Sequence, residues 1–532
     1  MDINPMNITM RELLEKRARK NPDKIYALFE PDIKISYGEF DLKVNQVANS
    51  LLRWGIKKGD RVGIFLKNCP EFLYLYFAVA KIGAIMVPMN TGYPPDELAY
   101  AINHSEQSLL FADPGAHNTI QTARTLCPLL KEVILTGKEP ILGFRGFDEF
   151  IDQAPSDLGP TDVTPDDLVS ICYTSGTTAR PKGVMLHQRI YVLAGEFWAG
   201  AMECTPSDRL LGFFPIFHAN VGVYVVMGAM VYNASAVFLE TFSVKQHWDK
   251  VRKYGATEFN STGSILAMLY AQPETTQDRD NPVRVVINGI NAGSIKEGFE
   301  SRFSLKILDA YSLTECLAGT QERLQDLSSR HPKRFYTIGR PADRTRVQIV
   351  QDDEKEPPEG SPGEIILKGP TVCRGYWKDS ETTSKTIRSD WLHTGDNGYR
   401  DKEGFLYFVD RKKDMIKRRG ENIASAEVER ALNSHPKIQE SAVIGVPDLY
   451  ADEEVKAYIM LKPGETLTPE EIIDYCLNYL EPFKIPRYIE FRDSFPRPVA
   501  IPKILKTELR KEKPDLTVGC YDRGPKLPKK SS

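Results

Sequence analysis

The chain has 532 residues, 69 basic and 72 acidic side chains and a formal net charge of -3 at pH 7. A chain of this length exceeds one ordinary core, which predicts two or more domains. Because the charges nearly balance, neither a nucleic acid nor an anionic membrane surface is expected as a partner.

Cysteine usage and hydropathy indicate an intracellular protein. The eight cysteines are scattered without a CxxC pair, as is typical of reduced thiols and not of a disulfide framework or a zinc site. The first residues are polar and contain no apolar signal core. Residues 219–238 form an apolar run of nearly membrane-spanning length, but Asn220, Asn233 and Ser235 interrupt it. We expect a buried helix and a strand there, no integral membrane segment and a cytoplasmic location.

The first 240 residues alternate helical and strand patterns. Residues 10–20 are amphipathic at helical spacing, and residues 25–30 are typical of a strand. Residues 35–68 predict strand, helix and strand, and residues 72–90 predict a helix followed by a buried strand. Strands that alternate with helices in this way indicate layered α/β sheets.

A hydroxyl-rich loop follows the apolar strand pattern of residues 168–173. Its sequence is YTSGTTARPKG, residues 173–183. Hydroxyls, a flexible backbone and cationic side chains suit a phosphate, and α/β folds place phosphates at strand ends. A polar surface turn is the alternative. The Walker pattern is absent, which disfavours kinases and GTPases of that type. The candidate phosphate-binding residues are Thr174, Ser175, Gly176, Thr177, Thr178 and Lys182.

Three further strand ends carry candidate site residues. FFPIFHAN, residues 213–220, predicts an aromatic strand that ends at His218, although a lone histidine beside apolar residues is usually structural. RVVINGINAGS, residues 284–294, predicts a strand and a turn containing Gly289, Ile290 and Asn291, with a plain turn as the alternative. LKILDAYSLTECL, residues 305–317, predicts a strand and then a loop.

These stretches resemble the adenylate-forming superfamily, which includes acyl- and aryl-CoA synthetases, peptide-synthetase adenylation domains and luciferases. The resemblance covers residues 10–512, with Ala179 and Ser312 where the family usually has glycine. It implies a large N-terminal region of layered α/β sheets with a β-barrel-like part, and a small mobile α+β C-terminal domain. The implied domains are an AMP-binding domain (1–411), a hinge segment (412–423) and a lid domain (424–532).

The resemblance also implies roles in ATP binding. The 289–291 turn would pack against adenine, which Tyr311 would flank, with Asp309 and Ser312 in the same motif. Thr314 would offer its hydroxyl to a phosphate or to the substrate carboxylate. Glu315 would bind Mg²⁺ carried by ATP, since carboxylate oxygen is a preferred ligand of that ion. The remaining implied residues are His218 at the acyl pocket, Asp396 at both ribose hydroxyls and Arg411 near the ribose and phosphate.

The C-terminal part supplies two candidate lysines. KKDMIKRRGEN, residues 412–422, could be a solvated linker or a basic patch; the resemblance makes it a hinge at Lys413, with Lys417 and Gly420 on the face used in thioester formation. FPRPVAIPKILKTELR, residues 495–510, resembles the segment whose lysine enters the site for adenylation. That lysine would be Lys503, despite Pro502 in place of glycine and one extra residue; Lys506 is a second candidate.

The resulting prediction is an AMP-forming acid–thiol ligase. It would use ATP and Mg²⁺ to convert a carboxylic acid into an acyl-adenylate, and transfer the acyl group to coenzyme A with release of AMP and pyrophosphate. The nearest resemblance is to the carnitine/crotonobetaine-CoA ligase branch, and a small or medium-chain fatty acid is the alternative substrate. Two other functions stay open: an enzyme that loads a carrier-protein thiol, and a catalytically silent relative that binds nucleotide or acyl-CoA. Monomer and homodimer are both compatible with the sequence.

Overall fold

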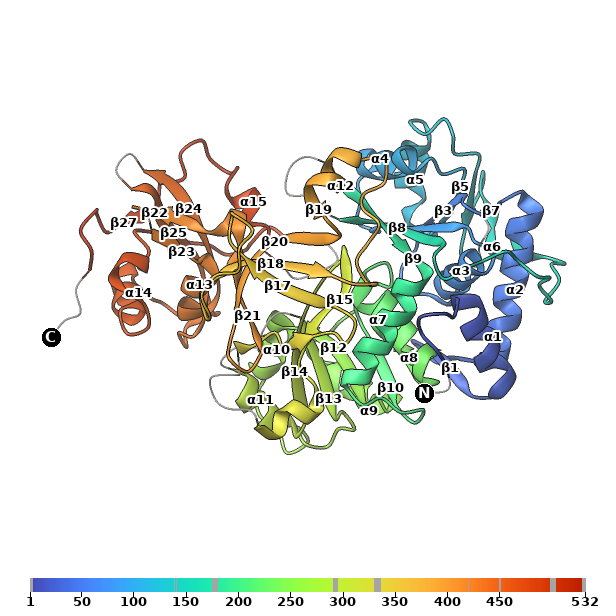
Figure 1. Cartoon of the computed structure of the whole chain (residues 1–532), viewed down its shortest axis with the longest axis horizontal. Helices are drawn as coiled ribbons and strands as arrows, with labels where there is room; N and C mark the ends of the chain where they lie inside the picture. Colours follow the sequence, from blue (N-terminus) through green and yellow to red (C-terminus); the bar gives the residue numbers. More distant parts are fainter. Residues whose placement is uncertain are drawn as a thin grey trace. The chain divides into compact units, whose positions relative to one another are not determined.

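The computed structural model describes most of the chain in two compact units (Figure 1). The first unit comprises residues 1–347 and 367–392, and the second comprises residues 348–366 and 393–532. The described residues are 3–137, 139, 141–174, 180–289, 295–329, 336–419, 421–448, 451–497 and 504–528, with the side chains of 328 and 329 excluded.

The first unit contains a nine-stranded sheet in the order β16-β15-β14-β13-β12-β10-β11-β1-β2. Its six central strands, from β14 to β1, are parallel to their neighbours, and the remaining strands pair antiparallel at the two edges. The strands, in sheet order, are Arg340–Pro341, Cys316–Gln321, Lys306–Leu313, Val285–Gly289, Glu258–Thr262, Arg209–Gly212, Ser235–Phe238, Ile25–Phe29 and Ile33–Ser36.

The second sheet of this unit has seven strands in the order β7-β6-β5-β3-β4-β8-β9. It is parallel except for the β8–β9 hairpin, which carries the hydroxyl-rich loop. The strands, in sheet order, are Arg145–Gly146, Glu132–Leu135, Leu109–Ala112, Arg61–Phe65, Ile85–Pro88, Leu168–Thr174 and Lys182–His187.

Helices cover both sheets, and the side chains of successive strand residues enter two different cores. Val62 and Ile64 belong to the large core shared with the nine-stranded sheet, whereas Phe65 belongs to a smaller core with α4 and α5. This alternation follows from the two-residue period of a strand. The helices are α1 Met10–Lys20, α2 Tyr37–Trp54, α3 Pro70–Lys81, α4 Pro95–Ser105, α5 His117–Arg124, α6 Phe147–Ile151, α7 Gln188–Ala201, α8 Val226–Tyr232, α9 His247–Tyr254, α10 Gly263–Tyr270, α11 Lys296–Phe303, α12 Ser380–Thr386 and the π-helix η2 Asn220–Val225.

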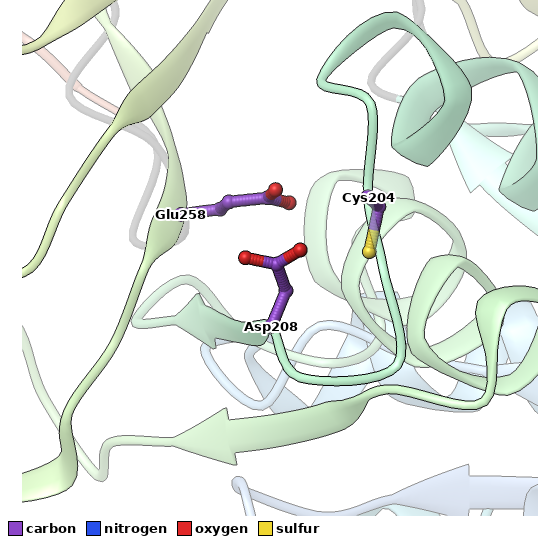
Figure 2. Close-up of side chains that lie close together, drawn as sticks. All are labelled: Cys204, Asp208 and Glu258. Carbon is purple, nitrogen blue, oxygen red and sulfur yellow. The ribbon is translucent and has the colours of Figure 1, made fainter.

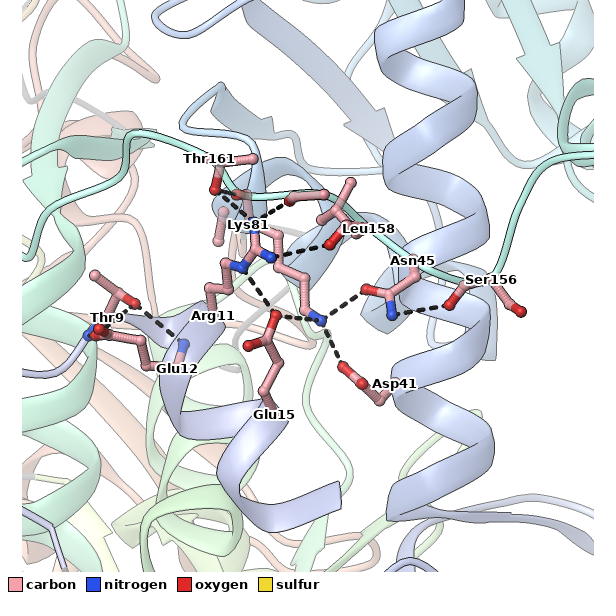
Figure 3. Close-up of polar contacts among 12 residues, drawn as sticks. Thr9, Arg11, Glu12, Glu15, Asp41, Asn45, Lys81, Ser156, Leu158 and Thr161 are labelled. Atoms are coloured by element: carbon pink, nitrogen blue, oxygen red, sulfur yellow. Dashed lines mark hydrogen bonds and ion pairs between the residues drawn. The ribbon is translucent and has the colours of Figure 1, made fainter. Parts of the chain in front are cut away.

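A buried cation joins the first three helices (Figure 3). Lys81, at the end of α3, has a fully buried side chain. Its Nζ lies 2.5 Å from Asp41 Oδ1 and 2.8 Å from Asn45 Oδ1 on α2, and 3.5 Å from Glu15 Oε1 on α1. Because a buried charge needs such partners, Lys81 fixes the relative positions of the three helices.

The second unit is mixed α and β. A six-stranded sheet in the order β23-β22-β25-β26-β27, with β24 beside β25, packs with α13 and α14. A smaller sheet, β17-β18-β20-β19 with β21 beside β20, contains the chain crossings between the units. The elements are β17 Arg346–Val350, β18 Gly363–Lys368, β20 Trp391–Arg400, β21 Leu406–Arg411, β22 Ile416–Arg418, β23 Glu421–Ile423, α13 Ser425–Asn433, β24 Ile438–Asp448, β25 Asp452–Leu461, α14 Pro469–Cys476, β26 Tyr488–Phe491, α15 Lys506–Leu509 and β27 Tyr521–Asp522. The remaining strand of the smaller sheet, β19 Ile387–Arg388, belongs to the first unit.

The predicted α/β class, the early helices and strands and the mixed C-terminal part are confirmed. The apolar run forms η2, α8 and β11 as buried elements. No helix among the described residues has the length and apolar character needed to cross a bilayer.

The aromatic strand predicted up to His218 is wrong, because β10 ends at Gly212 and the following residues form turns. The hinge at residues 412–423 stays a prediction.

Candidate active site

The carboxyl edge of the nine-stranded sheet gathers several predicted residues. β10, β12, β13 and β14 are parallel, so they end at one edge, where α/β proteins bind ligands. Gly289 ends β13, Ser312 lies near the end of β14, and Thr314 and Glu315 form the turn after it. His218 follows β10 at the same edge.

Aromatic side chains line this edge. The hydroxyl of Tyr224, in the π-helix, lies 2.6 Å from Ser312 Oγ. The Tyr224 ring packs against Trp198 of α7 with ring centroids 4.2 Å apart, and Trp198 Nε1 donates to the Leu317 carbonyl at 2.8 Å. These contacts connect α7 and the π-helix to the YSLTE motif. π-helical turns are frequent at functional sites, and this one begins two residues after His218, the residue predicted for the acyl pocket.

His218 is neutral at physiological pH. Burial lowers the pKa of the imidazole to about 4. The Asn220 backbone amide donates to His218 Nδ1 at 3.2 Å, which places the ring proton on Nε2. The histidine can therefore donate one hydrogen bond without carrying a charge.

Asp309 is bonded inside the protein. Its Oδ2 lies 2.6 Å from Lys296 Nζ, and its Oδ1 accepts from Asn288 Nδ2 at 2.7 Å. Lys296 also pairs with Glu322 at 2.5 Å. All four side chains are buried, and Tyr311, at 2% exposure, is buried too. This network holds together the ends of β13 and β14.

Helix α4 contacts both described stems of the hydroxyl-rich loop. Thr174 and Lys182 are cross-strand partners at the open end of the β8–β9 hairpin. The Tyr100 hydroxyl donates to the carbonyl of Pro181 at 3.2 Å, and His104 Nδ1 lies 2.8 Å from the hydroxyl of Tyr173. Burial, followed by the charge of Lys378, lowers the pKa of His104. Ser175, Gly176, Thr177 and Thr178 lie outside the described residues, as do Ile290 and Asn291.

Glu315 is half-buried and has one side-chain partner among the described residues. The Tyr376 hydroxyl donates to Glu315 Oε1 at 2.8 Å. Lys182 Nζ lies 5.4 Å from the centroid of the Tyr376 ring, within cation–π range. One tyrosine therefore connects the predicted metal ligand to the predicted phosphate-binding lysine.

The predicted ribose-binding pair lies in the second unit. Asp396 and Arg411 are cross-strand partners on β20 and β21, with Arg411 Nε 3.7 Å from Asp396 Oδ1. The adjacent turn is held by Glu364, which accepts from the Gly395 amide at 2.9 Å and pairs with Lys412 at 3.0 Å. Burial alone would raise the pKa of Glu364, but Lys412 and the Gly395 amide hold it below its ordinary value.

The described C-terminal lysines differ in their surroundings. Lys417 is exposed on β22, and its backbone amide donates to Glu453 at 2.8 Å. Lys506 Nζ lies 2.7 Å from Glu429 and 2.7 Å from Ser425 Oγ. Lys503 and Gly420 lie outside the described residues.

Comparison with known proteins decides the family. Residues 14–377 match the model of the AMP-binding enzyme family, and residues 427–499 match the AMP-binding enzyme C-terminal domain. The chain belongs to the AMP-binding enzyme family. The crotonobetaine/carnitine–CoA ligase of Salmonella typhi is 35% identical over 517 residues, which cover 94% of this chain and 98% of that protein.

Solved structures of CoA ligases share the fold. The crystal structure of an anthranilate CoA ligase in complex with anthranoyl-AMP is 25% identical with a TM-score of 0.89, covering 96% of this chain and 98% of its own. ATP-bound MatB from Rhodopseudomonas palustris is 26% identical with a TM-score of 0.85, covering 95% and 99%. This AMP-binding enzyme is an acyl-CoA synthetase, an acid–thiol ligase that uses ATP and coenzyme A and proceeds through an acyl-adenylate.

The sequence did not predict three aromatic residues that contact the predicted site residues or pack beside them: Tyr376, Trp198 and Tyr224. Residues 363–379 gave no candidate site residue, yet Tyr376 bonds Glu315 and contacts Lys182. Trp198 and Tyr224 carried no motif, because their proximity depends on how α7 and the π-helix pack. The stretch around Tyr376, GYWKD, carries no signal for these contacts, because they join segments that are far apart in the sequence.

Cys204, Asp208 and Glu258 form a buried group with metal-ligand chemistry (Figure 2). This group already has a cation of its own, Arg284. Ligand atoms of Cys204, Asp208 and Glu258 lie within 4.8 Å of one another. Arg284 lies 3.1 Å from Asp208 and also bonds Glu258. Burial raises the pKa of Glu258 to about 8 against the opposing effect of Arg284. A metal ion would have to displace the guanidinium.

Proposed function

We propose that this acyl-CoA synthetase acts on a small carboxylic acid with a quaternary ammonium group, of the carnitine and crotonobetaine kind. The observation that carries the proposal is the buried Trp198–Tyr224 pair, in which the Tyr224 hydroxyl bonds Ser312 just before Thr314 and Glu315. The face of an aromatic ring attracts a ligand cation. The name of the 35% identical relative supports the same class of acid.

The reaction consists of two successive nucleophilic displacements. A carboxylate oxygen attacks the α-phosphorus of ATP, and the bond to pyrophosphate breaks to leave acyl-AMP. The sulfur of coenzyme A then attacks the acyl carbon, AMP leaves and the thiol proton passes to solvent. Neutral His218 would donate a hydrogen bond to the carboxylate without forming an ion pair with it. Lys182 and Thr174 would contact the ATP phosphates.

Glu315 fits a role in holding Mg²⁺. It offers the oxygen chemistry that Mg²⁺ prefers, and Tyr376 occupies only one of its two carboxylate oxygens. When bound, the ion would supply positive charge to the phosphate oxygens. A Glu315→Gln variant is expected to lose about a hundredfold in adenylation rate, as is typical when an electrostatic partner of the transition state is removed.

The lysine roles separate the two half-reactions. We propose that Lys503 serves adenylation and Lys417 serves thioester formation, while Asp396 accepts the ribose hydroxyls. Lys503→Ala should then abolish adenylation but still convert synthetic acyl-AMP to acyl-CoA, and Lys417→Ala should mainly slow the second step. Retention of both half-reactions in Lys503→Ala would reject the first assignment, and a defect confined to adenylation in Lys417→Ala would reject the second.

The substrate class is tested by acid-dependent exchange of pyrophosphate into ATP. The matched acids are crotonobetaine and 5,5-dimethylhex-2-enoate, which replaces the cationic nitrogen with carbon at the same size. We expect crotonobetaine to be preferred about tenfold or more, and Trp198→Leu to reduce this preference, because the cation–π contribution is lost. Equal use of both acids would reject the cationic substrate in favour of a neutral acid.

Two further outcomes would reject the proposal more broadly. Exchange with no acid in a wide panel would indicate a silent binding protein. Normal exchange combined with transfer only to a phosphopantetheinyl carrier protein, and not to free coenzyme A, would indicate a carrier-loading enzyme.

A further inference from the structure

Residues 372–379 connect the turn that supplies Glu315 to the strand β9 that supplies Lys182. The Trp377 amide donates to the carbonyl of Gly183 at 2.7 Å, so the segment pairs with β9 directly after the hydroxyl-rich loop. The Cys373 amide donates to the carbonyl of Glu315 at 2.8 Å. The segment therefore ties the exit of the loop to the turn after β14 through the backbone.

Tyr376 makes the same connection through its side chain. Only 7% of this residue is exposed. Its hydroxyl bonds Glu315 Oε1 at 2.8 Å, while its ring lies 5.4 Å from Lys182 Nζ. The phenol hydroxyl carries the one proton that this contact can use, so Tyr376 donates and the carboxylate accepts.

This hydrogen bond restricts Glu315 in a way that suits metal binding. A glutamate side chain loses rotamer freedom when it is ordered, and an existing hydrogen bond removes part of that cost before a ligand arrives. Tyr376 bonds Oε1, and within the described part of the chain the second oxygen has no hydrogen-bond donor and is left to accept from a ligand. Hydrogen bonds that orient a metal ligand are worth about 10–100-fold in metal affinity or activity.

We propose that Tyr376 is a positioning residue for binding of the metal–nucleotide complex. Its hydroxyl orients Glu315 toward Mg²⁺, and its ring holds the Lys182 ammonium for the ATP phosphates. The proposal rests on the proposed function where it assigns Mg²⁺ to Glu315. The hydroxyl and the ring have separate tasks, so two substitutions separate them.

The test measures ATP binding by calorimetry, without acid or coenzyme A, across a range of Mg²⁺ concentrations and in EDTA. Tyr376→Phe removes the hydroxyl and keeps the ring, so half-saturation with Mg²⁺ should rise about tenfold while affinity for metal-free ATP is unchanged. Tyr376→Leu also removes the ring, and should weaken metal-free ATP binding as well. Binding of Mn²⁺ to the ATP complex, followed by electron paramagnetic resonance, gives a second readout.

The control is Tyr254→Phe, which removes a buried tyrosine hydroxyl bonded to the Pro31 carbonyl at 2.7 Å, remote from the Glu315 contacts. It should match the wild type in ATP and Mg²⁺ binding. A positioning role also predicts that Tyr376→Phe adds nothing further to the metal defect of Glu315→Gln. A loss of stability caused by Tyr376→Phe would weaken Mg²⁺ binding both with Glu315 present and in the Glu315→Gln background. Loss of a positioning role weakens it only when Glu315 is present, so the double variant separates the two causes.

Three results overturn the inference. The first is an unchanged Mg²⁺ dependence in Tyr376→Phe, and the second is a defect equal in EDTA and in Mg²⁺. The third is wild-type ATP binding with no dependence on Mg²⁺, which also removes the metal role of Glu315. Wild-type protein that binds ATP with Mg²⁺ but shows no acid-dependent exchange would instead reject the proposed function and leave the Tyr376 role intact.

Discussion

His247 lies in the large core with aromatic rings on several sides. Its ring centroid is 4.9 Å from that of Phe259, 5.1 Å from Trp248 and 5.6 Å from Phe213. Neither ring nitrogen has a hydrogen-bond partner in the described part of the chain. Burial, followed by the charge of Lys250, lowers the pKa to about 3, so the folded protein holds this imidazole neutral.

The lowered pKa predicts acid sensitivity. The unfolded chain protonates His247 near pH 6.5, whereas the folded chain does so near pH 3. Its contribution to stability is therefore complete above pH 6.5 and is lost progressively as the pH falls toward 3. At pH 5 the loss amounts to about 2 kcal/mol, at about 1.4 kcal/mol per pKa unit.

His247→Phe removes this proton-binding site while keeping an aromatic ring in the core. We expect the variant to lose less stability than the wild type between pH 7 and pH 5, as measured by urea unfolding at each pH. His187 and His218, whose pKa values burial lowers to about 4, leave part of the acid sensitivity in place. Parallel pH curves for the two proteins would contradict the assignment.

At the scale of elements, the Lys81 network sets the packing of α1, α2 and α3. Lys81→Met leaves the Asp41 carboxylate, which is 18% exposed, without its cation. Removing one partner of a buried ion pair costs about 3–5 kcal/mol, and we expect the lower end here because the carboxylates reach solvent. Lys58→Met is the control: Lys58 pairs with Asp167 at 2.8 Å but is 41% exposed, so it should cost less than about 1 kcal/mol in the same urea unfolding experiment.

A substitution in helix α4 is expected to weaken ATP binding without a large loss of stability. Tyr100→Phe removes the hydrogen bond to the Pro181 carbonyl and loosens one stem of the hydroxyl-rich loop. We expect ATP affinity to fall about fivefold, the effect of about 1 kcal/mol that one hydrogen bond contributes, with little change in melting temperature. The measurement is ATP titration in Mg²⁺. An unchanged affinity would show that the stem does not limit ATP binding.

Elements with strong local signals could be predicted from the sequence. The capping box of Ser36 and Glu39 and the left-handed Gly55, with φ of 104°, mark the limits of α2. The strand predicted for residues 213–218 is wrong because aromatic composition alone favours β-structure. The turn found there depends on contacts with a distant segment, such as Asn68 Nδ2 donating to the Phe214 carbonyl at 3.0 Å. Partnerships between distant segments, such as Tyr376 with Glu315, leave no periodic pattern.

At the scale of the whole molecule, the family and reaction could be inferred because several motifs occur in order over most of the chain. The residue pattern predicts Glu315 in a loop after a strand, and the structure has it in the turn after β14. A motif does not show whether the oxygens of a carboxylate bond other protein groups or are left to bind a ligand. Asp309 matches the family motif, yet both its oxygens are bonded to Lys296 and Asn288.

The proposed rotation of the C-terminal domain about Lys413 makes a prediction for the second unit. Asp410 precedes the predicted hinge and Ser425 follows it. The Ser425 hydroxyl donates to Asp410 Oδ2 at 2.6 Å, and the Ala426 amide donates to the same oxygen at 3.1 Å, where the N-terminus of α13 favours a negative charge. Lys506 donates to the same hydroxyl at 2.7 Å. Rotation about the hinge would have to break this cluster.

Under the proposed rotation, Ser425→Ala removes the central hydroxyl of the cluster and should shift the balance between the arrangement proposed for adenylation and the one proposed for thioester formation. A bond worth about 1–2 kcal/mol corresponds to a shift of roughly fivefold to thirtyfold in the populations. We expect the rate of pyrophosphate exchange and the rate of thioester formation from synthetic acyl-AMP to change in opposite directions. A variant that is merely destabilised would lose both rates together, and that result would remove the cluster from any role in domain rotation.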